Sequence, residues 1–188
     1  MIIKLYSFIS IIVNWYNIKK NRTKCGKNNV IKGIINIKGN IILGNNVYIN
    51  SNIIYNPIGG SSGTSLITNG DGIIIVGDNV GISNTAIFSH SKITIEKNVM
   101  IGGNCKLYDT DFHSIKYEYR IQKPDTHINT KPIHIKEGAF IGAHSIILKG
   151  VTIGKHSVVG AGSVVTHDIP DNEIWAGNPA KFVKRIED

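Results

Sequence analysis

A short segment near the middle of the chain combines two carboxylates with a histidine. Residues 109–114 read Asp-Thr-Asp-Phe-His-Ser, which places Asp109, Asp111 and His113 close together. A neutral imidazole, with an ordinary pKa of about 6.5, can accept a proton from a hydroxyl group at physiological pH. A carboxylate or a backbone carbonyl must hold its other ring nitrogen so that the reactive nitrogen stays unprotonated. We therefore predict that His113 is a general base, and that Asp109 and Asp111 orient it or bind the acceptor.

The elements that must position this segment come from a six-residue repeat. Aliphatic residues recur at this spacing without a slip at Ile135, Ile141, Ile147, Ile153, Val159 and Val165. Shorter runs of the same period lie at Ile31, Ile37, Leu43, Ile49 and Tyr55, at Val76, Ile82 and Phe88, and at Ile95, Ile101 and Leu107. A strand of about four residues and a two-residue corner account for a period of six. If the aliphatic residues point inward, three hexads form one coil of a triangular prism, and the runs predict about six coils.

The composition favours an all-β fold. The 188 residues include 20 Gly and many Ile, Val and Asn, which suit short strands and tight turns. The net charge of +8 fits a phosphate-bearing partner, but the lysines are scattered and only 7% of residues are aromatic, which argues against nucleic acid. Two cysteines, Cys25 and Cys105, are too few for a disulfide framework, so we expect a reducing compartment, the cytoplasm.

An apolar segment, residues 1–22, precedes the repeat and is predicted to be amphipathic. Lys4, Asn14 and Asn17 leave it too short an uninterrupted apolar stretch to cross a bilayer. No small-residue cleavage site of a signal peptide follows its apolar part. Two alternatives remain for a short helix over residues 1–20, which either packs on the body of the protein or makes peripheral contact with a membrane.

The remaining residues, 23–188, are predicted to form one β-helix domain with two interruptions and a tail. The longer interruption, residues 110–132, begins just before His113, and a loop of this length in a compact domain is usually functional or disordered. The shorter one, residues 57–64, is either a substrate lip or an irregular coil. The C-terminal tail, residues 167–188, is expected to be extended or helical.

Positions three hexads apart should stack, so that corner residues form vertical columns. Two adjacent columns of small residues predict a shallow channel, which suits a thin, extended ligand such as a pantetheine arm. The alternative is that small residues only permit the corner. The stacked residues Ile82, Ile101, Ile141 and Val159 are followed by Ser83, Gly102, Gly142 and Gly160, and then by Asn84, Gly103, Ala143 and Ala161.

The repeat and three motifs resemble the hexapeptide-repeat acyltransferases over residues 30–185. Gly-Ala-Gly-Ser-Val-Val-Thr at 160–166 and Ala-Gly-Asn-Pro-Ala-Lys at 176–181 are similar to galactoside and maltose acetyltransferases. Residues 109–114 resemble enzymes that O-acetylate bacterial surface polysaccharides. The resemblance implies a left-handed prism, acetyl-CoA (coenzyme A) as acyl donor, and a homotrimer with each active site between two prisms.

The resemblance also implies roles for single residues. Lys181 and Lys184 match residues that supply cationic contacts, while His167 replaces a lysine of the family and leaves one phosphate contact in doubt. Asn84 matches an asparagine at the acceptor site, where its amide could position the acceptor or hold the tetrahedral oxyanion. The residues expected at the coenzyme are Gly142, Ala143, Ala161, Thr166, His167, Lys181 and Lys184.

We expect the chain to transfer an acetyl group from acetyl-CoA to the hydroxyl of a sugar or oligosaccharide in bacterial surface polysaccharide biosynthesis. His113 would act as general base in a direct attack, without an acyl-enzyme. Alternatives are N-acetylation of an amino sugar, modification of an antibiotic, and a non-catalytic scaffold, since stacked coils alone can serve as binding surfaces. No two histidines are five positions apart, the spacing of zinc ligands in carbonic anhydrases with this prism, so no metal is expected.

Overall fold

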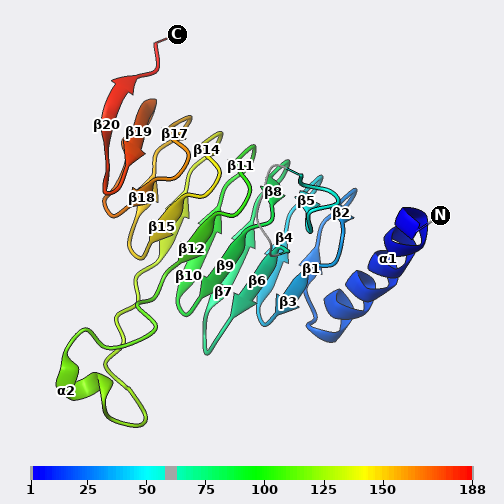
Figure 1. Ribbon diagram of the computed structural model, residues 1–188, viewed down its shortest axis with the longest axis horizontal. Coiled ribbons are helices and arrows are strands. Elements are labelled where there is room, and N and C mark those ends of the chain that lie inside the picture. Colours follow the sequence, from blue (N-terminus) through cyan, green and yellow to red (C-terminus); the bar gives the residue numbers. More distant parts are fainter. Residues whose placement is uncertain (1, 58–62, 188) are drawn as a thin grey trace.

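Successive strands form three sheets that enclose a triangular prism (Figure 1). The computed structural model describes residues 2–57 and 63–187. The first sheet contains β1 (Lys24–Cys25), β4 (Ile41–Leu43), β7 (Ile73–Val76), β10 (Lys92–Ile95), β13 (Ile133–Ile135) and β16 (Thr152–Ile153). The second contains β2 (Val30–Lys32), β5 (Tyr48–Asn50), β8 (Gly81–Ser83), β11 (Met100–Ile101), β14 (Phe140–Ile141), β17 (Val158–Val159), β19 (Glu173–Gly177) and β20 (Ala180–Arg185). The third contains β3 (Asn36–Lys38), β6 (Ser65–Thr68), β9 (Ala86–Ser89), β12 (Lys106–Tyr108), β15 (Ile146–Leu148) and β18 (Val164–Val165).

One strand from each sheet in turn makes one coil, so β1 to β18 make six coils. The predicted left-handed parallel β-helix of about six coils is confirmed. After the sixth coil, β19 pairs in parallel with β17, and β20 turns back along β19 as an antiparallel strand. The C-terminal tail is therefore extended, which was one of its two expected conformations.

The aliphatic positions of the repeat fill the core of the prism. Ile101 stacks between Ile82 and Ile141, and Ile141 stacks on Val159, which is the predicted column. All four side chains are at most 3% exposed. Burying one aliphatic side chain contributes about 1.5–3 kcal/mol, and each coil can bury its side chains only against its neighbours. The stacked coils therefore stabilise one another.

The inward position shifts by one residue between β8 and β9. Ile87 is buried and pairs with Leu107, whereas Phe88 lies half-buried on the outer surface. The corner at Asn84 is one residue shorter than the equivalent corner of the next coil, which moves the following strand out of the six-residue phase. The expectation that Phe88 points inward is therefore wrong. Tyr55, at the end of the first run, lies in the turn after β5 and not in a strand.

Close stacking at the corners explains the column of Ser83, Gly102, Gly142 and Gly160, which we call the glycine column. A Cβ atom on Gly142 would lie 2.5 Å from the backbone nitrogen of Ala161, and one on Gly102 would lie 2.6 Å from that of Ala143. Both distances are far below van der Waals contact, so a residue with a side chain would push consecutive coils apart. The packing of the coils therefore requires glycine at these corners, whether or not a ligand also contacts Gly142.

We expect Gly142→Ala to lower the free energy of unfolding by roughly 1–3 kcal/mol, because the added methyl group overpacks the corner. Thermal melting followed by circular dichroism measures the change. Gly81→Ala is the matched control, because a Cβ atom there meets no atom within 4 Å. Equal melting temperatures for the two variants would contradict the close packing at Gly142.

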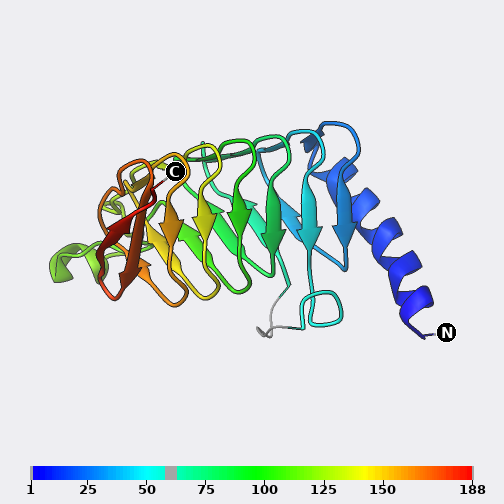
Figure 2. The same cartoon turned by 90° about the horizontal axis from the view of Figure 1, so that it is seen from above.

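The helix α1 (Ile2–Lys20) covers the N-terminal end of the prism and packs against β2 and β3 (Figure 2). The helix therefore packs on the body of the protein, which was one of its two expected arrangements, and its outer side stays exposed. No helix in the described ranges is both long and apolar enough to span a bilayer. Of the interruption at residues 57–64, residues 58–62 lie outside the described part of the chain.

Candidate active site

Residues 110–132 form a loop that projects from the prism between β12 and β13 (Figure 1). We call this segment the His113 loop. Thr110 and Thr130 join its two arms at the base in an antiparallel bridge. A single helical turn, α2 (Tyr117–Arg120), lies within the projecting part. The closed base fixes the place at which His113 leaves the prism.

The residue before His113 has a left-handed backbone. Phe112 has a φ angle of 62°, which is unfavourable for a residue with a side chain. Its ring packs against the rings of Phe88 and Tyr108, with centroid distances of 5.0 and 5.2 Å. These aromatic contacts hold the turn in place. The His113 side chain emerges beyond them with 71% of its surface exposed.

Asp125 is the carboxylate that the structure places beside His113. The distance from His113 Nδ1 to Asp125 Oδ2 is 3.7 Å, and the Asp125 side chain is only 12% exposed. This distance is too long for a hydrogen bond, but a small movement of the exposed ring would close it, and catalytic contacts are often long before substrate binds. With Nδ1 facing the carboxylate, Nε2 is left to accept a proton. The sequence prediction missed Asp125, because no motif marks a residue twelve positions after the histidine.

Ser114 anchors the Asp125 carboxylate. Its hydroxyl donates a hydrogen bond to Oδ1, and its backbone N–H donates one to Oδ2 at 2.8 Å. These two hydrogen bonds, with a smaller effect of His113, lower the pKa of the Asp125 carboxyl. Because the folded pKa is lowered, the ionised carboxylate stabilises the loop fully above about pH 4, the ordinary pKa of aspartate. That contribution is lost as the pH falls through the lowered value.

The two carboxylates predicted from the motif are engaged elsewhere. Asp109 is fully buried and accepts hydrogen bonds at 2.6 to 2.9 Å from the turn at residues 89–91. The Asp109 carboxylate therefore stabilises that turn inside the prism and does not point toward His113. Asp111 pairs with Lys149 at 2.6 Å, and its Oδ2 atom is buried without a hydrogen-bond partner in the described part of the chain. Neither side chain orients His113, but Asp111 keeps one acceptor atom for a ligand.

A pocket of about 380 Å³ lies inside the His113 loop, next to the catalytic candidate. Two of its lining rings, Tyr119 and His127, stack in parallel with a centroid distance of 3.8 Å. Arg120 donates to the carbonyl oxygens of Ser114 and Ile115 at 3.0 and 2.9 Å, which ties α2 to the segment after His113. The pocket is lined by Ser114, Ile115, Lys116, Tyr119, His127 and Asn129.

The alanine column, which consists of Asn84, Gly103, Ala143 and Ala161, lies on another edge of the prism than the His113 loop and becomes more exposed toward its C-terminal end. Ala143 is half-buried and Ala161 is exposed. At the other end of this column, Asn84 is buried, and its Oδ1 accepts a hydrogen bond from the backbone N–H of Asn52 at 2.7 Å. The Nδ2 atom of Asn84 is buried and has no partner among residues 2–57 and 63–187. Such donors are rare in proteins, and a ligand oxygen would satisfy this one.

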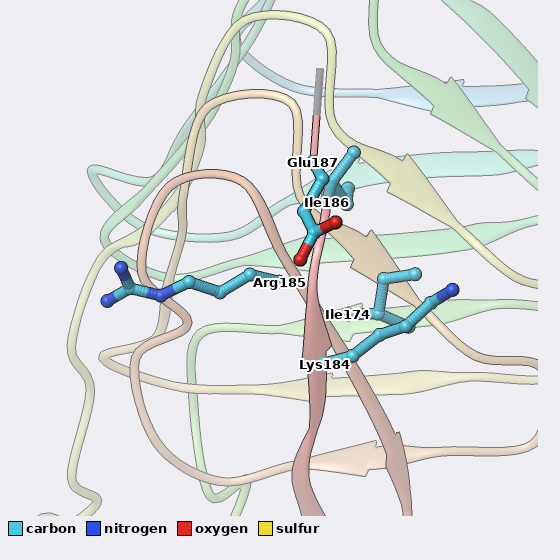
Figure 3. A pocket seen from close by; sticks show the side chains of 5 residues that line it. All are labelled: Ile174, Lys184, Arg185, Ile186 and Glu187. Atoms are coloured by element: carbon cyan, nitrogen blue, oxygen red, sulfur yellow. The ribbon is translucent and has the colours of Figure 1, made fainter.

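The predicted cationic residues lie on β20. Ala176 lies directly next to Gly160, because a Cβ atom on Gly160 would meet the Ala176 side chain. Lys181 pairs with Ala176 across the C-terminal hairpin. Lys181 therefore lies at the C-terminal end of the columns. Lys184 lines a pocket of about 360 Å³ formed by the C-terminal hairpin. Figure 3 shows Lys184 and Arg185 on opposite sides of the strand. Both side chains nevertheless border this one pocket.

Thr166 and His167 lie at the corner that follows β18. The Thr166 hydroxyl and His167 Nδ1 are 2.8 Å apart, and His167 is exposed. The hydrogen bond between them holds the imidazole close to the backbone. The His167 side chain therefore extends less far from the backbone than the lysine that the family has at this position.

One chain does not bring His113 to the alanine column. The columns follow β11, β14 and β17, at the edge between the second and third sheets. The His113 loop follows β12, at the edge between the third and first sheets. The two halves of the predicted site therefore lie on different edges of the same prism.

Cys105 is unsuited to nucleophilic catalysis. It is fully buried, its thiol donates a hydrogen bond to the carbonyl oxygen of Gly142 at 3.2 Å, and burial raises the pKa of the thiol. Within residues 2–57 and 63–187, no group of three or more histidine, cysteine and acidic side chains is arranged as a metal site.

Two family profiles match the repeat. The profile described as "Bacterial transferase hexapeptide (six repeats)" matches residues 132–167, which span β13 to β18. A second profile, "Hexapeptide repeat of succinyl-transferase", matches residues 92–106. The matches therefore fall on the regular coils on both sides of the His113 loop.

Known proteins with similar sequences and structures are acyltransferases by name. Galactoside O-acetyltransferase of Escherichia coli is 40% identical over 105 residues, which cover 56% of this chain and 50% of that protein. A solved mutant of AntD, an N-acyltransferase from Bacillus cereus in complex with dTDP and coenzyme A, has a TM-score of 0.68 at 25% identity and covers 87% of this chain and 84% of that one. A hexapeptide-repeat acetyltransferase from Vibrio cholerae, complexed with acetyl-CoA, has a TM-score of 0.61 at 21% identity, covering 99% and 87%.

The coils and these matches define a left-handed β-helix built from hexapeptide repeats. The resemblance to the hexapeptide-repeat acyltransferases, and among them to galactoside O-acetyltransferases, is thereby confirmed. The chain spans about half the length of the curated relatives it matches.

Proposed function

We propose that the chain transfers an acetyl group from acetyl-CoA to the hydroxyl of a sugar or oligosaccharide, in bacterial surface polysaccharide biosynthesis. The exposed His113 ring carries this proposal, because its Nδ1 faces Asp125 beside a pocket of polar and aromatic groups. Relatives named galactoside O-acetyltransferase support a sugar acceptor. Solved structures of similar fold, described as complexes with coenzyme A or acetyl-CoA, support the donor.

His113 acts on the acceptor in this reaction. Acetyl-CoA supplies a thioester whose carbonyl carbon is open to attack. Nε2 of His113 accepts the hydroxyl proton as the acceptor oxygen bonds to that carbon, and Asp125 stabilises the imidazolium that forms. When the carbon–sulfur bond breaks, the imidazolium can return the proton to the leaving thiolate. No acyl-enzyme is needed.

Asn84 is proposed as a donor at the acceptor site. Its Nδ2 atom is buried and has no partner among the described residues, whereas its Oδ1 is fixed by Asn52. A preorganised donor of this kind could hold the developing oxyanion or position the acceptor hydroxyl. Asp111, whose Oδ2 also has no partner, is a second proposed contact to the acceptor.

The proposed assembly is a homotrimer that completes each site between two chains. An apolar stripe runs up the outer face of the second sheet, where Tyr48, Met100 and Phe140 are exposed in register with one another and with Gly81. Exposed apolar patches of this kind usually mark interfaces. Packing along this stripe would let the His113 loop of one chain approach the alanine column of the next, which a single chain cannot do.

The alanine column and the C-terminal residues are proposed to hold the coenzyme. Ala143 and Ala161 leave room for the pantetheine arm. Thr166 follows β18, at the edge between the third and first sheets, so it would meet the coenzyme of a different site from the one that these two alanines line. Lys181 stands at the end of the columns, where a phosphate group would extend from the arm. The glycine column lies too close to the next coil to provide that room, so Gly142 is proposed to contribute backbone groups only.

Replacement of Lys181 or Lys184 by alanine should weaken coenzyme A binding, because each lysine can meet a phosphate as a point charge. We expect a loss of roughly 5-fold per lysine, similar to the effect of one partly exposed ion pair. Isothermal titration at low and high salt measures it, and high salt should weaken the parent in the same way. Equal affinities for coenzyme A and its dephospho form would show that neither lysine contacts the 3′-phosphate.

Asp125→Asn should lower turnover by roughly 10- to 100-fold, because a neutral amide no longer stabilises the imidazolium or fixes the ring. The Michaelis constant for acetyl-CoA should change little, since Asp125 touches only the His113 loop. The control is Asp171→Asn, which removes an exposed carboxylate paired with Lys136 and should keep the parent's kinetics. A rise in the Michaelis constant with unchanged turnover would contradict a positioning role.

Two other functions compete with sugar O-acetylation. AntD is described as an N-acyltransferase, which favours an amino sugar as the acceptor, and stacked coils alone can serve as a scaffold. Thiol release from acetyl-CoA with a panel of sugars and amino sugars separates O- from N-transfer by the acceptor that is consumed. If no acceptor releases thiol and coenzyme A does not raise the melting temperature, the scaffold is the better interpretation.

A further inference from the structure

The side of α1 that faces the prism combines several asparagines with Ile18, which packs against the core. Asn14 Nδ2 donates to the carbonyl oxygen of Gly33 at 2.8 Å, and its Oδ1 accepts from the backbone N–H of Ile35 at 3.0 Å. Asn21 donates to the carbonyl oxygen of Ile37 at 2.8 Å. These backbone groups belong to the first described coil, where no preceding coil pairs with them, so the asparagines satisfy them instead. Hydrogen bonds therefore hold the helix with these asparagines inward.

The opposite side of α1 is apolar and exposed. At roughly 100° per residue, Leu5, Phe8, Ile12 and Trp15 fall on one stripe, and their exposed fractions lie between 51% and 62%. A surface helix normally turns its apolar stripe toward the core, so this helix has the reverse orientation. Its large exposed side chains mark an interaction site. We call these four residues, together with Ile9, Ile11 and Tyr16 beside them, the α1 apolar face.

The same end of the molecule carries the whole net charge. No aspartate or glutamate precedes Asp71, whereas eight of the 21 lysines and arginines do. The 13 basic residues that follow are balanced by all 13 acidic residues, so the net charge of +8 belongs to residues 1–70. Lys19 and Lys20 lie in the last turn of α1, and Lys38 lies exposed in the first coil. The helix that carries the α1 apolar face therefore ends in two lysines, and no acidic residue of residues 1–70 offsets their charge.

We propose that α1 and the first two coils form a docking surface for an anionic lipid bilayer. The helix lies in the plane of the bilayer with its apolar face in the headgroup region, and Lys19, Lys20 and Arg22 contact lipid phosphates. Trp15 and Tyr16 belong to the residue types that prefer this boundary. The proposal does not depend on acetyl transfer, because none of these residues belongs to the proposed site.

Charge distinguishes the bilayer from a second copy of this chain. Two copies that met through α1 would bring two surfaces of net positive charge together, and like charges in contact oppose association. An anionic bilayer complements both the apolar residues and the excess of lysine and arginine. Association should therefore require the anionic lipid and weaken as salt rises.

Vesicle sedimentation of the full chain tests the proposal. Vesicles of equal parts phosphatidylcholine and phosphatidylglycerol should bind the chain at least roughly tenfold more tightly than vesicles of phosphatidylcholine alone. Trp15 fluorescence should shift to shorter wavelength on binding, which can be followed in a Trp175→Phe background. Absence of sedimentation with the anionic vesicles, or equal sedimentation with both kinds, would overturn the proposal.

Matched variants separate the lipid surface from other causes. The triple variant Phe8→Ser, Ile12→Ser and Trp15→Ser should lose vesicle binding but keep the parent's melting temperature, because the asparagine contacts of α1 remain. Control substitutions at equally exposed positions remote from α1, Ile121→Ser and Val183→Ser, should bind vesicles like the parent. If the triple variant sediments as well as the parent, or changes only the oligomeric state measured by light scattering, the α1 apolar face does not bind lipid.

Discussion

His113→Ala is expected to lower turnover by roughly 10²- to 10⁴-fold, the usual contribution of a positioned general base. The ring is mostly exposed and fills no part of the core, so the variant should keep the parent's fold, assembly and affinity for acetyl-CoA. Loss of the ring leaves the acceptor hydroxyl without a group to take its proton. Steady-state thiol release with the best acceptor of the panel measures turnover, and titration with acetyl-CoA measures binding.

The control for this variant is a histidine outside the proposed site. His134 lies on the first sheet, with Nε2 at 2.7 Å from a carboxylate oxygen of Glu96. His134→Gln should retain turnover close to that of the parent. If His113→Ala also stays within a few-fold of the parent, the base lies elsewhere and the His113 loop only borders the acceptor.

Leucine at Ala143 or Ala161 is expected to weaken the affinity for acetyl-CoA strongly while the melting temperature barely changes. Both positions face outward at a corner, so a longer side chain fills the path proposed for the pantetheine arm and leaves the core untouched. The neighbouring residues Ile141 and Val159 point inward and are fully buried. Their replacement by alanine should lower the free energy of unfolding by roughly 2–4 kcal/mol through cavity formation.

These four variants test the groove and the core together. Thermal melting and calorimetric titration with acetyl-CoA should divide them into two pairs, one deficient in binding and one in stability. Leucine variants that keep full affinity would place the coenzyme on another face of the prism. If the leucine variants at Ala143 and Ala161 unfold while the alanine variants at Ile141 and Val159 stay folded, the assignment of Ile141 and Val159 to the core and of the two alanines to the surface is wrong.

The fold was predictable because each hexad points its aliphatic residue inward at a fixed spacing. Ile82, Ile101, Ile141 and Val159 stack as counted from the sequence. The shift between β8 and β9 was not predictable, because Ile87 and Phe88 are both apolar and either could fill the inward position. The length of the corner at Asn84, which depends on how the coils stack, decided between them.

The candidate site was predictable only in part. The residue types at 109–114 were enough to single out His113 as a candidate base. They could not show which carboxylate lies beside it, because neighbours in sequence need not be neighbours in space. Asp109 continues the in-and-out alternation from buried Leu107 and so turns into the prism, away from His113. Asp125 reaches the histidine because the His113 loop folds back on itself through Ser114, a contact without a local sequence signal.

The sequence by itself determined that coils stack, that His113 stands where they are interrupted, and that no acidic residue precedes Asp71. These features follow from period and composition, which are local properties of a chain. Only the tertiary structure decided which carboxylate meets His113 and which side of α1 faces the prism. Asn14 and Asn21 turn inward because the backbone groups of the first coil need hydrogen-bond partners, and this need outweighs the burial of the apolar stripe.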